Sequence, residues 1–298
     1  MQTINHVKRY INLITYDTLN CHGHLVDLQS PKVMGVLNFN EDSFYPASRI
    51  KAIDDMIYSA DKMIKEGAWF IDIGAMSSRP GSKILSEDEE LKRIKIYFSE
   101  LKSTFPKALI SVDTLHSKVA EWVLSHGAAM INDISGGMYD KDMLHVVGKY
   151  PVPFVIMHME GLPETMQNDP HYENVVLSVF DYFTERIESA KKANIVDLIL
   201  DPGIGFGKTI VHNFSLLHYL DAYDVLRFPI LVGVSRKSFI RNVLDVNVEE
   251  ALNGTTAVHM LALAKGAKIL RVHDVKEAVQ CIKIWEEFNS DNIVNMEF

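Results

Sequence analysis

The sequence predicts an α/β fold: a closed (β/α)8 barrel of the TIM type, preceded by an N-terminal β-hairpin. Short apolar segments alternate with longer amphipathic ones, as in a chain of βαβ units. The apolar segments recur about every 33 residues, close to the roughly 30 residues of one such unit. We therefore interpret residues 1–298 as a single domain. An open, doubly wound sheet is the alternative, because it also alternates strands and helices.

The apolar segments have the character of strands that are buried on both faces. They are rich in β-branched residues, hardly alternate with polar ones, and end in a polar residue or glycine. In chain order they are residues 33–38, 69–74, 109–113, 129–133, 153–158, 197–201, 229–234 and 268–273. A turn at residues 20–23, ahead of them, predicts a hairpin that plugs the N-terminal end of the barrel.

The segments between the strands have helical periodicity. In residues 54–66, apolar side chains recur on one face at Met56, Ala60 and Met63. Glycine follows several of these segments, as it does at the C-terminal ends of helices. Helices are expected at residues 54–66, 87–103, 116–126, 173–193, 249–265 and 275–288.

The composition is that of an ordinary globular protein, with 47% hydrophobic and 23% charged residues. The formal net charge of −9 argues against nucleic acid or an anionic membrane as the main partner. Small-molecule substrates are expected instead, and an anionic one is compatible if cationic side chains gather at one site.

Several features favour a cytoplasmic location. The N-terminus lacks the apolar core and the cleavage site of a signal peptide. No apolar segment approaches the roughly 20 residues of a membrane span. Cys21 and Cys281 have no spacing that suggests a zinc site or a disulfide framework, which fits a reducing compartment.

Polar residues stand at the ends of the predicted strands, where the chemistry of a TIM barrel is located. They are Asn38, Asp72, Asp113, Asn132, Asp133, His158, Asp201, Arg271 and His273. Helix capping is the alternative role for some of the carboxylates.

A cationic group can form because the first, second and eighth strands are neighbours in a closed barrel. Arg79 follows the second strand, and Arg271 and His273 end the eighth. Guanidinium groups match phosphate oxygens well, so this group predicts a di- or triphosphate site. Asn38 would add a neutral oxygen for Mg²⁺. A surface ion pair is the alternative for Arg79.

A second group, Asp113, Asn132 and Asp201, consists of carboxylates and an amide. Such groups suit the hydrogen-bonding edge of an aminopyrimidinone-like ring. Asp201 could equally act as a general base. The glycine-rich residues 201–208 could cradle phosphate or present Phe206 to an aromatic ligand, and the second reading fits better because the cations lie elsewhere.

Together these motifs resemble the dihydropteroate synthase family over about residues 33–280. The matching segments are MGVLNFNEDSF, DIGAMSSRPG, SVDT, INDISGG, MHMEGLPETMQ, DPGIGFGKT, GVSRKSF and ILRVHDV. The resemblance implies the condensation of 6-hydroxymethyl-7,8-dihydropterin pyrophosphate with p-aminobenzoate, with Mg²⁺ as cofactor. It also suggests a homodimer and a sulfonamide target.

The resemblance also implies site residues. Pyrophosphate would be held by Arg79, Arg271 and His273, with Asn38 touching pyrophosphate and Mg²⁺. The pterin ring would be bound by Asp113, Asn132, Asp201 and Lys237, in a slot lined by Met157 and Gly233. The p-aminobenzoate site would be formed by Ser78, Pro80, Phe206 and Ser238. Asn38, Arg79, Lys237, Arg271 and His273 are the expected catalytic residues.

Two loops depart from the family pattern. The first lacks the usual Thr-Pro and the later acid and paired glycines, and the second has Met76 where the family has glutamate. These departures leave a pterin-binding paralogue with weak or no synthase activity as the alternative. A corrinoid-dependent methyltransferase on a related barrel would share the pterin acids but would not need Arg79, Arg271 and His273.

Overall fold

The predicted barrel is confirmed. The computed structural model describes residues 17–38, 49–76, 84–161 and 170–290. Eight parallel strands close on themselves in the order β10-β3-β4-β5-β6-β7-β8-β9, which excludes an open sheet. The strands are β3 (Lys32–Asn38), β4 (Phe70–Gly74), β5 (Leu109–Asp113), β6 (Met130–Asp133), β7 (Phe154–Met157), β8 (Leu198–Asp201), β9 (Ile230–Val232) and β10 (Ala267–Val272).

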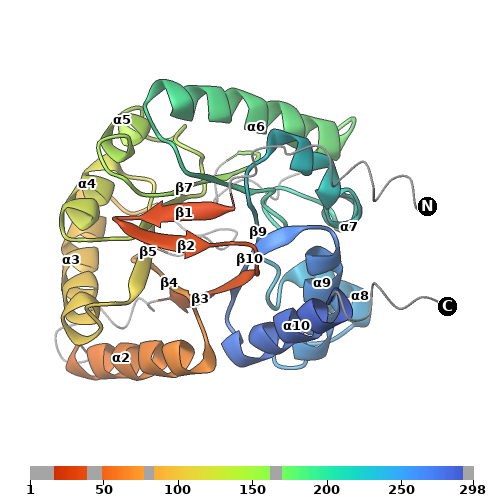
Figure 1. Ribbon diagram of the computed structural model, residues 1–298, viewed down its shortest axis with the longest axis horizontal. Helices are drawn as coiled ribbons and strands as arrows, with labels where there is room; N and C mark the ends of the chain where they lie inside the picture. The colour runs from red at the N-terminus through yellow and green to blue at the C-terminus, as the bar shows by residue number, and fades with distance from the viewer. Residues whose placement is uncertain (1–16, 39–48, 77–83, 162–169, 291–298) are drawn as a thin grey trace.

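Helices surround the barrel (Figure 1). They are α2 (Arg49–Glu66), α3 (Glu87–Thr104), α4 (Ser117–Ser125), α5 (Met143–Val147), α6 (Val175–Lys192), α7 (Ile210–His218), the 3-10 helix η2 (Leu220–Leu226), α8 (Ser238–Leu244), α9 (Leu252–Ala264) and α10 (Val275–Phe288). All six predicted helices are present. None of the helices in the described ranges is long and apolar enough to span a membrane.

Four helices escaped the sequence analysis: α5, α7, η2 and α8. They have five, nine, seven and seven residues respectively. So few residues complete at most about two and a half helical turns, so an apolar face hardly repeats. The C-terminal ends of the six predicted helices lie within one residue of the observed ends. Gly67 (φ 105°) and Gly127 (φ 88°), which follow two of these ends, adopt the left-handed conformation.

The predicted hairpin is present and closes the N-terminal end of the barrel. Strands β1 (Thr18–Cys21) and β2 (His24–Asp27) pair antiparallel and lie across the barrel in Figure 1. Its buried side chains form one apolar cluster with the inward side chains at the amino ends of the barrel strands. The cluster contains Leu19, Cys21, Val26, Leu28, Met34, Phe70, Ala129, Met130, Val155, Ile199, Leu231 and Ile269.

The barrel interior changes from apolar to polar two residues further along the strands. Side chains alternate between the two faces of a strand, so residues two apart point to the same side. Phe70, Met130 and Ile269 lie in the apolar cluster. Asp72, Asn132 and Arg271 therefore point into the same interior, one layer closer to the carboxyl ends. The fold thus places a polar layer above an apolar floor.

Candidate active site

Asp72 on β4 is the centre of the polar layer. Its side chain is fully buried. Its Oδ1 accepts a hydrogen bond from the Ser111 hydroxyl at 2.6 Å. Its Oδ2 accepts from Asn132 Nδ2 at 3.2 Å and from Arg271 Nε at 2.7 Å. Four strands of the barrel are thus joined through one carboxylate.

Arg271 on β10 lies between two acids. Its Nη2 donates to Asp113 Oδ2 at 3.1 Å, in addition to the bond from Nε to Asp72. Burial alone would lower the pKa of Arg271, but Asp72 and Asp113 outweigh it and raise the pKa. The guanidinium is held in one orientation, and no described residue accepts from Nη1. The N–H groups on Nη1 are therefore available to bind an anionic ligand.

Asp113, at the end of β5, has an unusual environment for a carboxyl group. Burial raises its pKa to about 7, against the opposing effect of Arg271. The neighbouring carboxylates Asp72, Asp133 and Asp201 contribute to this rise. The pKa of Asp113 therefore lies in a range where its charge can change when a ligand binds.

Asn132 and Asp201 lie on the same inner face, and each has one bond that orients it. Asn132 Nδ2 donates to Asp72, which leaves its Oδ1 as an acceptor. Asp201 Oδ1 accepts from Gly203 N at 2.8 Å. Burial raises the pKa of Asp201, against the lowering effect of Lys237.

Lys237 follows β9 and is part of the same group. Its Nζ donates to the Ile204 carbonyl and lies 4.5 Å from the centre of the Phe206 ring. Burial lowers the pKa of Lys237 to about 8, against the raising effect of Asp201. A Cβ on Gly233 would lie 3.8 Å from Arg271 Cβ and 4.0 Å from Lys237 Nζ, so Gly233 lies beside both cations.

An apolar cluster stands beside these polar groups. Met157, at the end of β7, and Phe206 are buried together with Leu115 and Ile134. Met76, which replaces the family's glutamate, packs against this cluster, and its Sδ accepts from Leu85 N at 3.4 Å. The polar and apolar groups together offer a surface of the kind that an aromatic heterocycle needs.

The glycine-rich segment 201–208 does not have its N–H groups arranged for phosphate. Gly205 N donates to Asn213 Oδ1 and Phe206 N to the Gly203 carbonyl. A side chain at Gly203 (φ 66°) would meet the His158 carbonyl oxygen at 1.8 Å. The segment is folded tightly against the end of β7 and places Phe206 in the apolar cluster beside Lys237, which favours the second of the two sequence-based readings.

Not all predicted site residues join this group. His273 is exposed at the end of β10, with Nδ1 3.1 Å from Ser235 Oγ. Ser238 is exposed at the start of α8. Ser78, Arg79, Pro80 and the side chain of Asn38 lie outside the described residues, so their roles stay predictions.

Sequence reasoning did not predict the contacts of two residues of the site. Asp72 was noted at a strand end, but no role was predicted for it. The alternation of side chains along the strands places Asp72 on the inner face with Asn132 and Arg271, and this pattern could have indicated a role in the site. Lys208 is buried, and its Nζ lies 3.0 Å from His158 Nδ1. Asp133 proved to be structural, since its carboxylate accepts from Ser135 N and Gly137 N.

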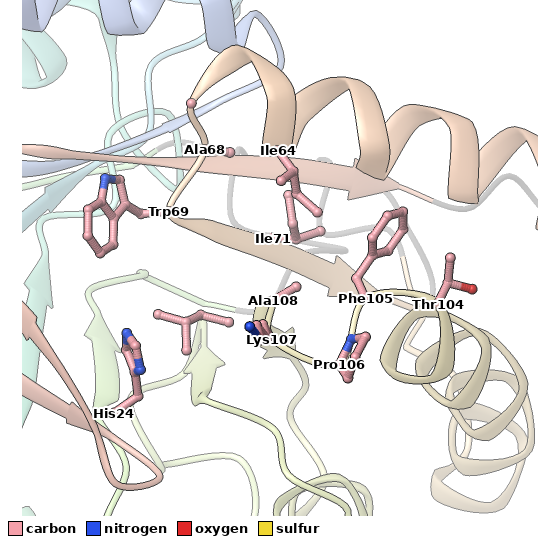
Figure 2. Close-up of a pocket in the computed structure, with 12 residues that line it drawn as sticks. His24, Ile64, Ala68, Trp69, Ile71, Thr104, Phe105, Pro106, Lys107 and Ala108 are labelled. Atoms are coloured by element: carbon pink, nitrogen blue, oxygen red, sulfur yellow. The ribbon is translucent and has the colours of Figure 1, made fainter.

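A cavity of about 530 Å³ lies at the opposite end of the barrel, at the amino ends of β4 and β5. Figure 2 shows Ile64, Ile71 and Phe105 close together, with Trp69 and His24 at the other end. Its lining is largely apolar, and it contains none of the predicted site residues.

Known proteins match the chain over most of its length. A family model described as "Pterin binding enzyme" matches residues 34–273. The dihydropteroate synthase of Haemophilus influenzae is 39% identical over 270 residues, which cover 90% of this chain and 98% of that protein.

Solved structures match it equally well. The dihydropteroate synthase of Yersinia pestis, solved in a sulfonamide drug complex, has a TM-score of 0.84 and 38% identity, and the match covers 91% of this chain and 98% of that one. The Xanthomonas albilineans enzyme with 4-aminobenzoic acid has a TM-score of 0.84 and 34% identity, over 92% and 98% of the two chains.

Proposed function

The chain belongs to the dihydropteroate synthase family of pterin-binding enzymes, and we propose that it carries out that family's reaction at the polar layer of its barrel. In this reaction, 6-hydroxymethyl-7,8-dihydropterin pyrophosphate condenses with p-aminobenzoate. The carbon–oxygen bond to pyrophosphate breaks, the arylamine nitrogen forms a bond to the same methylene carbon, and a proton leaves the nitrogen. The products are 7,8-dihydropteroate and pyrophosphate.

The observation that carries the proposal is the complementarity between the buried polar layer and a pterin ring. The ring's pyrimidinone edge offers an amino group and a ring N–H as donors and a carbonyl as acceptor. Asp201 supplies acceptors, Lys237 a donor, and Asn132 an acceptor through Oδ1. Asp113 adds a carboxyl whose pKa of about 7 lets it accept or donate.

Arg271 connects ring recognition to the departure of pyrophosphate. The guanidinium is fixed by Asp72 and Asp113, so the N–H groups on Nη1 are already oriented when negative charge develops on the leaving group. Groups oriented in advance stabilise that charge with little reorganisation. His273, two residues along the strand, would add a second donor, with Ser235 holding its Nδ1 side.

The attacking amine needs little help from the protein. A neutral arylamine already carries its lone pair, so no nucleophile–base pair is required. The chain's contribution is to hold the amine near the methylene carbon. We assign this task to the apolar side of the site, where Phe206 and Met157 lie, together with Ser78 and Pro80.

Magnesium is part of the proposal. The acids of the polar layer, Asp72, Asp113 and Asp201, are engaged by Arg271 or by a backbone N–H group, so they do not form a chelating set. Mg²⁺ keeps most of its waters and takes few protein ligands beside substrate phosphates, which fits a site built on Asn38 alone. Bound there, the ion would neutralise charge on the pyrophosphate.

We also propose a cytoplasmic homodimer that responds to sulfonamides. Both cysteines are unpaired and buried, as suits a reducing compartment. On α8 and α9, the apolar side chains of Val243, Leu244 and Leu261 are exposed and are candidates for a subunit contact. The Yersinia pestis relative has been solved in a sulfonamide drug complex.

Calorimetry tests the order of binding that this mechanism requires. p-Aminobenzoate is titrated into the protein with pterin alone, and then with pterin, pyrophosphate and Mg²⁺. Appreciable binding is expected only in the second case, because pyrophosphate would organise the loops around Phe44 and Ser78. Equal affinity in both cases would contradict the proposed mechanism.

A further inference from the structure

Lys208 ends the glycine-rich segment 201–208 and is a buried cation that the proposed reaction does not use. Its Nζ lies 3.0 Å from His158 Nδ1, and it donates to the carbonyl oxygens of His158 at 3.3 Å and of Phe206 at 2.9 Å. We propose that Lys208 is a positioning residue, which fixes Phe206 on the apolar side of the site so that this side can hold p-aminobenzoate. The proposal rests on the function proposed above and assigns Lys208 no contact with either substrate.

The protonation states of the two side chains fit this role. Burial lowers the pKa of His158 to about 3, so its ring is neutral in ordinary buffers. Burial also lowers the pKa of Lys208, to about 7, against the raising effect of Asp201. Between these two values the lysine is charged and has three N–H donors, and a neutral ring with its hydrogen on Nε2 accepts at Nδ1. Three donors thus match three acceptors.

His158, directly after β7, fastens both ends of the segment. Its N–H donates to the Asp201 carbonyl at 3.0 Å, and its carbonyl oxygen and Nδ1 face Lys208 at the other end. Gly203 makes room for this arrangement. A Cβ at this position would lie 1.8 Å from the His158 carbonyl oxygen and 3.3 Å from Lys208 Nζ. The segment is therefore closed against the end of β7 through the Lys208 side chain.

Phe206 connects the segment to the substrate site. Its ring packs in the buried apolar cluster with Met157, and Lys237 Nζ lies 4.5 Å from the ring centre. Lys208 holds the backbone of the same residue through its carbonyl oxygen. A shift of this backbone would move the ring relative to Met157 and Lys237, on the side assigned to p-aminobenzoate. The pterin edge is assigned mainly to side chains of the barrel strands, so pterin binding should change less.

Other contacts hold the segment from outside, so loss of the Lys208 amine should loosen it without unfolding the barrel. Gly205 N donates to Asn213 Oδ1 at 2.7 Å, which ties the segment to α7. The Gly207 carbonyl accepts from the Tyr172 hydroxyl at 3.0 Å. Neither bond involves the Lys208 side chain.

Hydrogen exchange followed by mass spectrometry tests the positioning without any substrate. Lys208→Met keeps the length of the side chain but removes its N–H groups. At about pH 6, where Lys208 is charged, exchange in residues 201–208 should be at least about 10-fold faster in this variant than in the wild type. Lys102→Met is the control, because Lys102 is a half-buried lysine that donates to the Ala108 carbonyl at the other end of the barrel. Its exchange in the segment should equal that of the wild type.

Steady-state kinetics at the same pH separates positioning from a purely structural role. In Lys208→Met, the KM for p-aminobenzoate should rise at least about 10-fold, while the KM for the pterin pyrophosphate should stay within about 3-fold. A general loss of stability would not act on one substrate alone. Lys102→Met should leave both KM values unchanged.

A milder pair of variants at His158 removes one of the three bonds. His158→Leu has no acceptor for Lys208, whereas the amide oxygen of His158→Asn can take the place of Nδ1. Exchange in the segment should be faster in His158→Leu than in His158→Asn. This comparison remains decisive if Lys208→Met does not fold.

The proposal is overturned if Lys208→Met, or His158→Leu in its place, exchanges the segment as slowly as the wild type. It is also overturned if the KM for p-aminobenzoate rises no more than the KM for the pterin pyrophosphate. A wild-type protein without turnover would instead contradict the proposed synthase reaction. The exchange rates would still decide whether Lys208 positions the segment.

Discussion

Asp72→Asn tests the central role assigned to the Asp72 carboxylate. The substitution keeps the size of the side chain, and a rotated amide can still accept from Asn132 and Arg271 while its NH2 group meets the Ser111 hydroxyl. What disappears is the negative charge that Arg271 contacts at 2.7 Å. Among the described residues, Asp113 would then be the remaining ion-pair partner of the half-buried Arg271 guanidinium.

The expected cost follows from that geometry. A charge-assisted hydrogen bond becomes a neutral one, and part of a buried charge is left uncompensated, so the free energy of unfolding should fall by about 2–3 kcal/mol. Urea unfolding measures it. Asp221→Asn, which breaks the half-exposed contact with Lys265, is the control and should cost less than about 1 kcal/mol.

The pKa of Asp113 distinguishes the loss of the Asp72 charge from a general destabilisation of the fold. The charge on Asp72 contributes to the raised pKa of Asp113. In Asp72→Asn, the Asp113 pKa should therefore fall below its value of about 7, as followed by carboxyl NMR. An unfolding free energy within about 0.5 kcal/mol of the wild type, or an Asp113 pKa that stays or rises, would refute the reasoning.

Three further predictions concern the glycine-rich segment 201–208, its Lys208, and Arg271 on β10. Gly203→Ala should lose at least about 3 kcal/mol in urea unfolding because its Cβ meets the His158 carbonyl, whereas Gly23→Ala, with open space, should lose about 1 kcal/mol; equal losses would contradict the steric argument. Burial lowers the pKa of Lys208 from 10.5 to about 7, so the unfolded state binds more protons between these values. Wild-type stability should rise with pH across that window relative to Lys208→Met, by at most about 1.4 kcal/mol per pH unit, and parallel pH profiles would disprove it. Arg271→Lys should weaken pterin pyrophosphate about 10-fold more than the pterin without phosphates, and equal losses in calorimetry would remove Arg271 from the pyrophosphate site.

The sequence was sufficient for the barrel because strands buried on both faces leave continuous apolar runs. The amphipathic segments between them were equally informative, since six helices lie within a few residues of their predicted places. Short helices such as α5 and α8 lack a repeating apolar face, so the periodicity of the sequence did not predict them. In segments of five to seven residues, amino-acid composition does not distinguish a helix from a loop.

The site was predictable in position but not in its internal contacts. Asp113, Asn132 and Asp201 could be placed at strand ends because the barrel brings those ends together. The pairing of Arg271 with Asp72 joins residues 199 positions apart, and nothing local in the sequence indicates it. Likewise, the contact between Lys208 and His158 depends on the tight fold of the glycine-rich segment against β7.

The most direct measurement is turnover by the purified protein with 6-hydroxymethyl-7,8-dihydropterin pyrophosphate, p-aminobenzoate and Mg²⁺. The account predicts that 7,8-dihydropteroate and pyrophosphate form in equal amounts, and that both products are lost in Arg271→Ala. A wild-type protein that binds the pterin pyrophosphate tightly but releases neither product would contradict the account, and would identify the chain as a pterin-binding relative without synthase activity.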